Sequence, residues 1–347
     1  MTDNYATAEE CRPLFELMNQ VKELAPWEWM EEMDIFGVQG LDAEEPDYVS
    51  VMGMAGEHFA VALYPGDRAL THLLQFEQIG PYGNPLDLLL IPQFQASFED
   101  RNTLTDKDRK MLKALGLKYR GRNAWPQLRA QQPACVPWYI ESADVPRMVR
   151  ALEQLLVVAP RVKENPDVLI PAGSDEFLVR EATQQGEELL WKDSVRTPSF
   201  STEEGIMIEL DSELMDTVYD LPEVSNVLEV ALSMMPSPVS DDSGRPYFPY
   251  MFIVVERESG MVMGMELLSP LPSLQAMWAE IPNQFLAQLA KVQVRPQVVH
   301  VNTELLASLL RGLDQLGIEF TLVEELPGVE AMQESLFGFL GGGLFEE

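Results

Sequence analysis

Residues 250–268 read YMFIVVERESGMVMGMELL, two apolar runs separated by the turn Ser259–Gly260, and this pattern predicts a β-hairpin. Downstream we predict a helix over 273–291, a strand at 297–302, a helix over 303–316, a strand at 318–324 and a closing helix over 328–340. Apolar strands that alternate with helices at this spacing imply right-handed crossovers between strands of one sheet. The C-terminal half is therefore predicted to be a mixed sheet covered by helices.

The N-terminal half shows the same mixture of elements. We predict helices over 7–24, 67–78 and 143–163, a hairpin within 47–66 and a strand at 136–140 (VPWYI). A short helix is predicted to begin after Thr105, which is a favourable N-cap residue, and to end at Gly116. The fold class is therefore α/β with α+β character throughout.

The length of 347 residues predicts two domains. The stretch KENPDVLIPAGSDE, residues 163–176, is rich in Pro, Asn, Asp and Gly, and we expect the boundary at 165–172. We therefore expect an N-terminal α+β domain over 1–165 and an acidic α/β domain over 166–347. The second is expected to begin with three strands, within 176–183, 187–194 and 205–210.

Charge is unevenly distributed along the chain, whose formal net charge is −32. Residues 1–165 hold 16 Lys and Arg against 25 Asp and Glu, a net −9, whereas residues 166–347 hold 8 against 31, a net −23. A field of this sign repels phosphate backbones and attracts basic surfaces. Broad binding of nucleic acid is therefore not expected, and we expect the partner to be another protein.

Several site classes lack their sequence signals. No apolar run approaches the roughly 20 residues that span a bilayer, so we expect no membrane segment. The N-terminal stretch lacks a signal-peptide pattern, and we expect a cytoplasmic protein. Cys11 and Cys135 are far apart, and the three histidines are isolated, which disfavours a disulfide framework and a zinc site. No cofactor is expected.

The basic segment, residues 107–129, holds eight Lys and Arg and a single acid, Asp108. Two interpretations are open for it. Its arginines could bind a phosphate, a carboxylate or a partner protein, with an aromatic ring as a stacking platform. Alternatively, the aromatic ring is part of the core and the arginines pair with the chain's own acids, which we favour. The candidate binding residues are Lys118, Arg120, Arg122, Trp125 and Arg129.

The stretch SFEDRNTLTDKDRKMLKALGLKYRGRNAWPQLRA, residues 97–130, resembles a family of uncharacterised bacterial proteins with the motif SFEDR, LGLKYRG and WPQLR in the N-terminal half. The C-terminal half, with RPYFPYMFIVVERESGMVMGMELL at 245–268, is similar to a second uncharacterised domain that accompanies it. The resemblance implies two α/β domains in a bacterial cytoplasmic protein. It implies no activity and no catalytic residues.

The order of elements from 247 to 340 also distantly resembles the ribonuclease-H-like fold of nucleases and transposases, in which acids on adjacent strands hold two magnesium ions. Glu256 and Glu304 are the corresponding candidates here, although they do not form a convincing ligand set. We therefore expect a non-enzymatic interaction protein that acts through charged surfaces. The alternative is a degenerate metal-dependent nuclease or phosphodiesterase.

Overall fold

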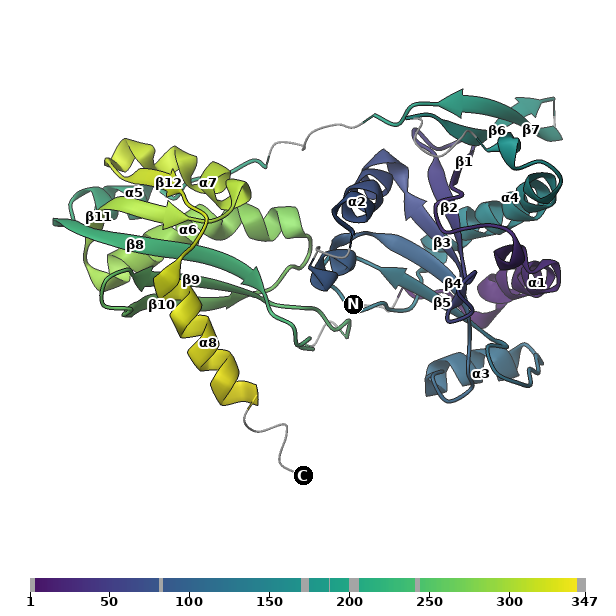
Figure 1. Ribbon diagram of the computed structural model, residues 1–347, viewed down its shortest axis with the longest axis horizontal. Coiled ribbons are helices and arrows are strands. Elements are labelled where there is room, and N and C mark those ends of the chain that lie inside the picture. The colour runs from purple at the N-terminus through teal and green to yellow at the C-terminus, as the bar shows by residue number, and fades with distance from the viewer. Residues whose placement is uncertain are drawn as a thin grey trace. The chain divides into compact units, whose positions relative to one another are not determined.

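The computed structural model describes residues 4–80, 84–169, 175–186, 188–199, 206–240 and 244–341 (Figure 1). It divides the chain into two compact units. The first comprises residues 1–132 and 136–202, and the second comprises 133–135 and 203–347. The two-domain α/β architecture predicted from the sequence is confirmed.

The first unit is built on a seven-stranded sheet with the order β5-β4-β3-β2-β1-β6-β7. Its pairs are antiparallel except for β1 and β6, which are parallel. The strands are β1 (Phe36–Gln39), β2 (Asp47–Met52), β3 (Phe59–Pro65), β4 (Gln93–Glu99), β5 (Trp125–Gln131), β6 (Phe177–Gln185) and β7 (Glu188–Arg196). The helices are α1 (Ala8–Leu24), α2 (Gly66–Ile79), α3 (Asp106–Ala114) and α4 (Val145–Glu164), with 3-10 turns at Pro26–Glu28, Pro85–Leu90, Ser142–Asp144 and Pro166–Val168.

Helices cover both faces of this sheet (Figure 1). On one face α1 and α4 bury apolar side chains such as Met18, Leu152 and Leu155 against the strands. On the other face α2 packs Leu70 and Leu73 in a smaller cluster. The alternation of buried and polar positions along α1 and α4 explains why the sequence predicted both helices.

The expected boundary at 165–172 lies before the β6–β7 hairpin, whereas the division of the chain lies after it. The physical reason is backbone pairing, since Gly37 to Gln39 of β1 pair with Val179 to Glu181 of β6. The Pro- and Asn-rich stretch that suggested a boundary is the connection from α4 back into the same sheet.

The second unit contains a five-stranded sheet with the order β10-β9-β8-β11-β12. The first three strands of that order are antiparallel, and β11 runs parallel to both β8 and β12. The strands are β8 (Glu223–Met234), β9 (Tyr250–Glu256), β10 (Val262–Leu268), β11 (Arg295–Val301) and β12 (Glu319–Leu322). The helices are α5 (Ser212–Tyr219), α6 (Leu274–Val292), α7 (Glu304–Leu310), a 3-10 turn at Arg311–Leu316 and α8 (Pro327–Gly341).

Two clusters form the core of the second unit. The larger one packs α5, α6 and α7 on one sheet face, with Phe252, Ile281 and Phe285 at its centre. The smaller one lies between the opposite face and α8 and includes Ile253 and Val329. The predicted hairpin at 250–268 is present as β9 and β10. Among the described residues no helix is both long and apolar enough to cross a bilayer.

Several element predictions were wrong. Residues 136–140 form no strand and contribute one bridge, between Trp138 and Ala130. Residues 206–210 are not a strand either, while residue 205 lies outside the described part. The strands β1, β5 and β8 were not predicted. Each lies in a stretch interrupted by glycine, proline or charged residues, which hides the period of two.

Candidate functional site

The basic segment contains the helix α3, and local capping holds its first turn. Asp108 N–H donates to Thr105 Oγ1 at 3.2 Å, and Thr105 N–H donates to Asp108 Oδ2 at 2.9 Å. This reciprocal arrangement is a capping box. Gly116, at φ +73°, follows the helix in a conformation that favours glycine. The predicted helix and both of its end signals are therefore confirmed.

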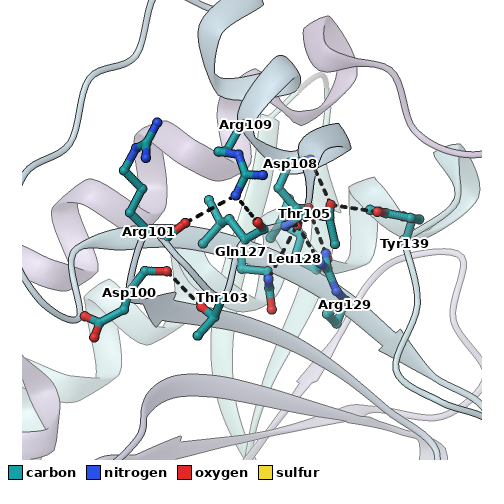
Figure 2. Close-up of polar contacts among 11 residues, drawn as sticks. Asp100, Arg101, Thr103, Thr105, Asp108, Arg109, Gln127, Leu128, Arg129 and Tyr139 are labelled. Carbon is teal, nitrogen blue, oxygen red and sulfur yellow. Dashed lines mark hydrogen bonds and ion pairs between the residues drawn. The ribbon is translucent and has the colours of Figure 1, made fainter.

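Arg129 makes the central contact of the segment, as Figure 2 shows. From β5 it donates to both oxygens of Asp108, at 2.9 and 2.6 Å, and to the Leu128 carbonyl at 2.8 Å. Both side chains are nearly buried, at 13% and 10% exposure. Two parallel hydrogen bonds between a guanidinium and a carboxylate give strong geometric restraint. The pair therefore anchors α3 to the edge of the sheet.

The protonation of Asp108 follows from this environment. Burial disfavours its charged form, but the hydrogen bonds and charge of Arg129 and the hydrogen bonds from Thr105 outweigh it and lower the pKa of Asp108. Asp108 is therefore an ionised structural carboxylate at neutral pH.

Aromatic rings surround the same contact. The hydroxyls of Tyr139 and Thr105 lie 2.7 Å apart, and the Arg129 guanidinium lies 4.8 Å from the centre of the Tyr139 ring. Lys107 Nζ lies 4.0 and 4.1 Å from the ring centres of Tyr5 and Tyr139. The adjacent pocket, bordered by Lys107, Asp108 and Tyr139, has about 20 Å³ of accessible space, enough for roughly one water molecule. Lys107 and Arg129 therefore make their contacts within the first unit.

Of the other six cations of the segment, Arg109 pairs with Asp106 at 2.6 Å, and the remaining five face solvent. We call this set the outer basic surface, and it comprises Lys110, Lys113, Lys118, Arg120 and Arg122. Arg122 is 92% exposed and lies 3.9 Å from Asp100, which is a weak contact. Within the described residues, no carboxylate lies within 4.0 Å of the other four cations. The segment is thus divided into inner cations, which make contacts within the first unit, and outer cations, of which Arg122 alone has a carboxylate of the described residues within 4.0 Å.

The loop that carries Lys118, Arg120 and Arg122 is held at its C-terminal end. Asn123 N–H donates to Asp100 Oδ1 at 2.8 Å, and Lys22 Nζ donates to the Asn123 carbonyl at 3.1 Å. Ala124 N–H donates to the Glu99 carbonyl at 3.0 Å. These bonds connect the loop to β4 and α1.

Trp125 begins β5 and packs against the core as a half-buried residue. Its ring centre lies 6.0 Å from that of Tyr119 and 5.7 Å from the Arg101 guanidinium. The cation over this ring is thus Arg101. This placement matches the interpretation of Trp125 as a core residue.

The two metal candidates lie in different local structures. Glu256 ends β9 and accepts hydrogen bonds from the hydroxyl and backbone N–H of Ser259 and from the backbone N–H of Glu258. These bonds, led by the Ser259 hydroxyl, lower the pKa of Glu256 to about 2. Glu304 is exposed in the first turn of α7. Across the described parts of the chain, no three His, Cys, Asp or Glu side chains are placed to hold a metal ion.

Another arginine–carboxylate contact that the sequence did not reveal involves a buried acid of the second unit. Glu229, in the middle of β8, has no exposed surface. Its Oε2 accepts the N–H groups of Gly328 and Val329, at 2.8 and 3.1 Å, from the first turn of α8. Its Oε1 lies 3.6 Å from Arg257 Nε and accepts no hydrogen bond from the described residues. A lone acid within the apolar run VLEVAL is the signal that could have located it.

Arg257 extends this contact toward the surface. Its Nη1 lies 2.6 Å from Nδ1 of His300 on β11, and its side chain is 40% exposed. His300 was interpreted as a strand residue, and it lies in β11 opposite Glu229.

Comparison with known families gives one match in each unit. Residues 12–180 match the model of a domain of unknown function, DUF7309, and residues 215–337 match that of another, DUF6930. No curated protein matches the chain. The resemblance to two uncharacterised domains without an assigned activity is thereby confirmed, and the chain combines a DUF7309 match over α1 to β6 with a DUF6930 match over α5 to α8.

Proposed function

We propose that this chain is a non-enzymatic, cytoplasmic binding protein that docks an acidic segment of another protein on its outer basic surface. The observation that supports the proposal is that Lys110, Lys113, Lys118 and Arg120 have no carboxylate within 4.0 Å among the described residues. The chain has 56 Asp and Glu with which they could have paired. Cations that are kept unpaired in such a chain are available to a partner.

The inner part of the segment supports the same proposal. The Asp108–Arg129 pair and the capping box hold α3, while Asp100 and Lys22 hold the end of the following loop. Charges on a preorganised backbone lose less conformational entropy when a partner binds. The expected contribution of such charges is to partner choice and association rate more than to affinity.

The charge of the whole chain favours a protein partner over nucleic acid. A net charge of −32 opposes the approach of a polyanion, whose binding depends on neutralising many phosphates at once. An acidic protein segment needs only a few contacts within the screening length of roughly 8 Å at physiological salt. Nucleic acid remains an outcome that the experiment distinguishes.

The test compares three immobilised proteins for capture from a lysate of the source organism. These are the wild type, Arg120→Glu/Arg122→Glu, and the control Lys291→Glu/Arg311→Glu, which makes the same charge change at exposed residues of the second unit. Each is used before and after nuclease treatment of the lysate, and the bound proteins are identified by mass spectrometry. A captured protein is then purified and titrated calorimetrically at two salt concentrations.

We expect a protein that the wild type and the control both retain and that the Arg120/Arg122 variant loses, with an affinity that falls as salt rises. The variant should melt at the wild-type temperature, because its substitutions are exposed. The proposal fails if all three proteins retain the same set, or if the captured material disappears after nuclease treatment.

A further inference from the structure

Each of the two sheets ends in two edge strands, and three of these four strands carry features that discourage pairing with another chain. The edge strand β5 contains Pro126, and Ala130 exchanges two backbone hydrogen bonds of 2.8 Å with Trp138. In the second unit, β12 is four residues long, and β10 has a register shift between Val262 and Gly264. Proline, shortness and bulges are the usual means by which edges are protected.

The fourth edge strand, β7, has none of these features. It pairs with β6 over nine consecutive positions, from Phe177–Arg196 to Gln185–Glu188, without a shift and without proline. No strand among the described residues pairs with its outer side, as Figure 1 illustrates for the end of the sheet. In an antiparallel edge strand, alternate residues direct their N–H and C=O groups away from the sheet.

The side chains of β7 also include exposed apolar groups. Leu189, Leu190 and Val195 are 50%, 41% and 56% exposed. Residues two apart in a strand share a face, so Leu189 and Val195 lie on the same face as Asp193. Asp193 is the residue that Arg161 of α4 contacts. A long, regular edge strand with exposed apolar residues is the kind that associates with another strand.

The sequence of β7, ELLWKDSVR, indicates that this other strand is a second copy of β7, because the two residues at each end of the strand are complementary when two copies run antiparallel. We propose that two copies of this chain pair through β7, antiparallel and about a two-fold axis at Lys192. In this register Glu188 lies opposite the partner's Arg196, and Leu189 lies opposite the partner's Val195. Opposite charges and apolar pairs directly across two strands are stabilising. A two-fold axis uses each contact twice, as is usual for homodimers.

Neighbouring registers that keep the faces aligned pair the side chains less well. A two-fold axis at Asp193 places two aspartates opposite each other and Leu190 opposite Arg196. An axis at Trp191 places Leu190 opposite Lys192 and leaves Val195 without an opposite residue in β7. Of these three axes, the one at Lys192 alone pairs an apolar residue with an apolar residue and an acid with a base, and it does so with all nine residues of β7 paired.

The axis at Lys192 brings two lysines together, which opposes pairing unless their charge is offset. Each Lys192 is 3.0 Å from Glu181 of β6 in its own chain, and this carboxylate offsets the charge. The pairing therefore joins two seven-stranded sheets through strands that lie in the first unit alone.

The test measures the mass of the full chain by sedimentation velocity over a range of concentrations. The variants are Leu189→Glu, Val195→Arg and the double variant Leu189→Glu/Val195→Arg, with Met207→Glu as a control at an 82% exposed apolar residue of the second unit. We expect a concentration-dependent dimer for the wild type and the control. Each single variant should lose the dimer, because it places one charge opposite an apolar side chain.

The double variant tests the register and should regain the dimer. At both ends of the paired strands, it places the carboxylate introduced at position 189 opposite the guanidinium introduced at position 195 of the other copy. Oxidised Lys192→Cys should form a disulfide-linked dimer, because directly opposite residues have Cα atoms roughly 4.5–5.5 Å apart, within disulfide range. Cys11 and Cys135 are buried and do not compete. The proposal is overturned if the wild type is monomeric at every concentration. It is also overturned if both single variants still form the dimer, or if the double variant stays monomeric.

Discussion

Asp108 in the first unit and Glu229 in the second are buried carboxylates that each lie beside an arginine and accept backbone N–H groups near the start of a helix. They differ in how many hydrogen bonds their carboxylate oxygens accept. Asp108 receives two hydrogen bonds from Arg129, whereas Arg257 approaches Glu229 to 3.6 Å without a hydrogen bond. One oxygen of Glu229 accepts nothing from the described residues.

This difference in hydrogen bonding corresponds to a difference in what each carboxylate stabilises. A buried ion pair with good geometry restrains the parts it joins, and removing one partner leaves a costly unpaired charge. The Asp108–Arg129 pair joins α3 to β5 and so stabilises the packing of this helix on the first sheet. Glu229 instead holds the first turn of α8 through Gly328 and Val329, and its contact with Arg257 is loose.

Arg129→Met should break the Asp108–Arg129 pair and cause the largest loss of stability among these substitutions. It leaves Asp108 buried without a cation, which costs about 3–5 kcal/mol of unfolding free energy. Urea unfolding of the full chain, followed by a probe in the first unit, measures the loss. Arg122→Met, at a 92% exposed residue, is the control and should change stability by less than about 0.5 kcal/mol. Equal effects of the two substitutions would contradict the role given to Arg129.

Glu229→Gln should weaken the second contact by an intermediate amount. The amide can still accept one N–H from α8, but it loses the negative charge that faces the helix N-terminus and Arg257, at a cost of about 1–3 kcal/mol. Hydrogen exchange should report faster opening of α8, while the first unit stays unchanged. Glu319→Gln, at an exposed position of β12, is the matched control. Unchanged exchange in α8 would show that Glu229 does not hold it.

The smallest effect concerns acid stability. Because the folded-state pKa of Asp108 is lowered, its stabilising contribution is complete above the unfolded value of about 3.9 and is lost as pH falls through the folded value. The melting temperature of the wild type should therefore fall more steeply below about pH 4 than that of Asp108→Asn. Parallel curves for the two proteins would indicate that Asp108 does not titrate in this way.

Local signals in the sequence were sufficient for some of these features. Thr105 and Gly116 define the ends of α3, and the apolar runs at 250–268 define the β9–β10 hairpin. The division between inner and outer cations could not be read in the same way. Arg129 and Arg122 have the same side chain, and only the packing of β5 beside α3 gives one of them a buried carboxylate.

Long-range pairing explains what remained hidden. β8 is the central strand of the second sheet, yet its first half is polar and Glu229 interrupts its apolar half, so the period of two is obscured. β1 is four residues long and includes Gly37, and its place in the sheet depends on a partner strand far along the chain. Pairing between distant segments is decided by tertiary contacts that a local pattern does not contain.

The parallel pair β1–β6 has a consequence for the order in which the first unit assembles during synthesis. Strands β1 to β5 are antiparallel neighbours that emerge in succession, whereas β6 emerges only after α4 is complete. Distant pairings of this kind form late because the intervening chain must first be ordered. A nascent chain that stops at residue 165 presents β1 as an open edge, and one that stops at 180, where the DUF7309 match ends, stops inside β6. The natural end point for producing the first unit alone therefore lies beyond β7.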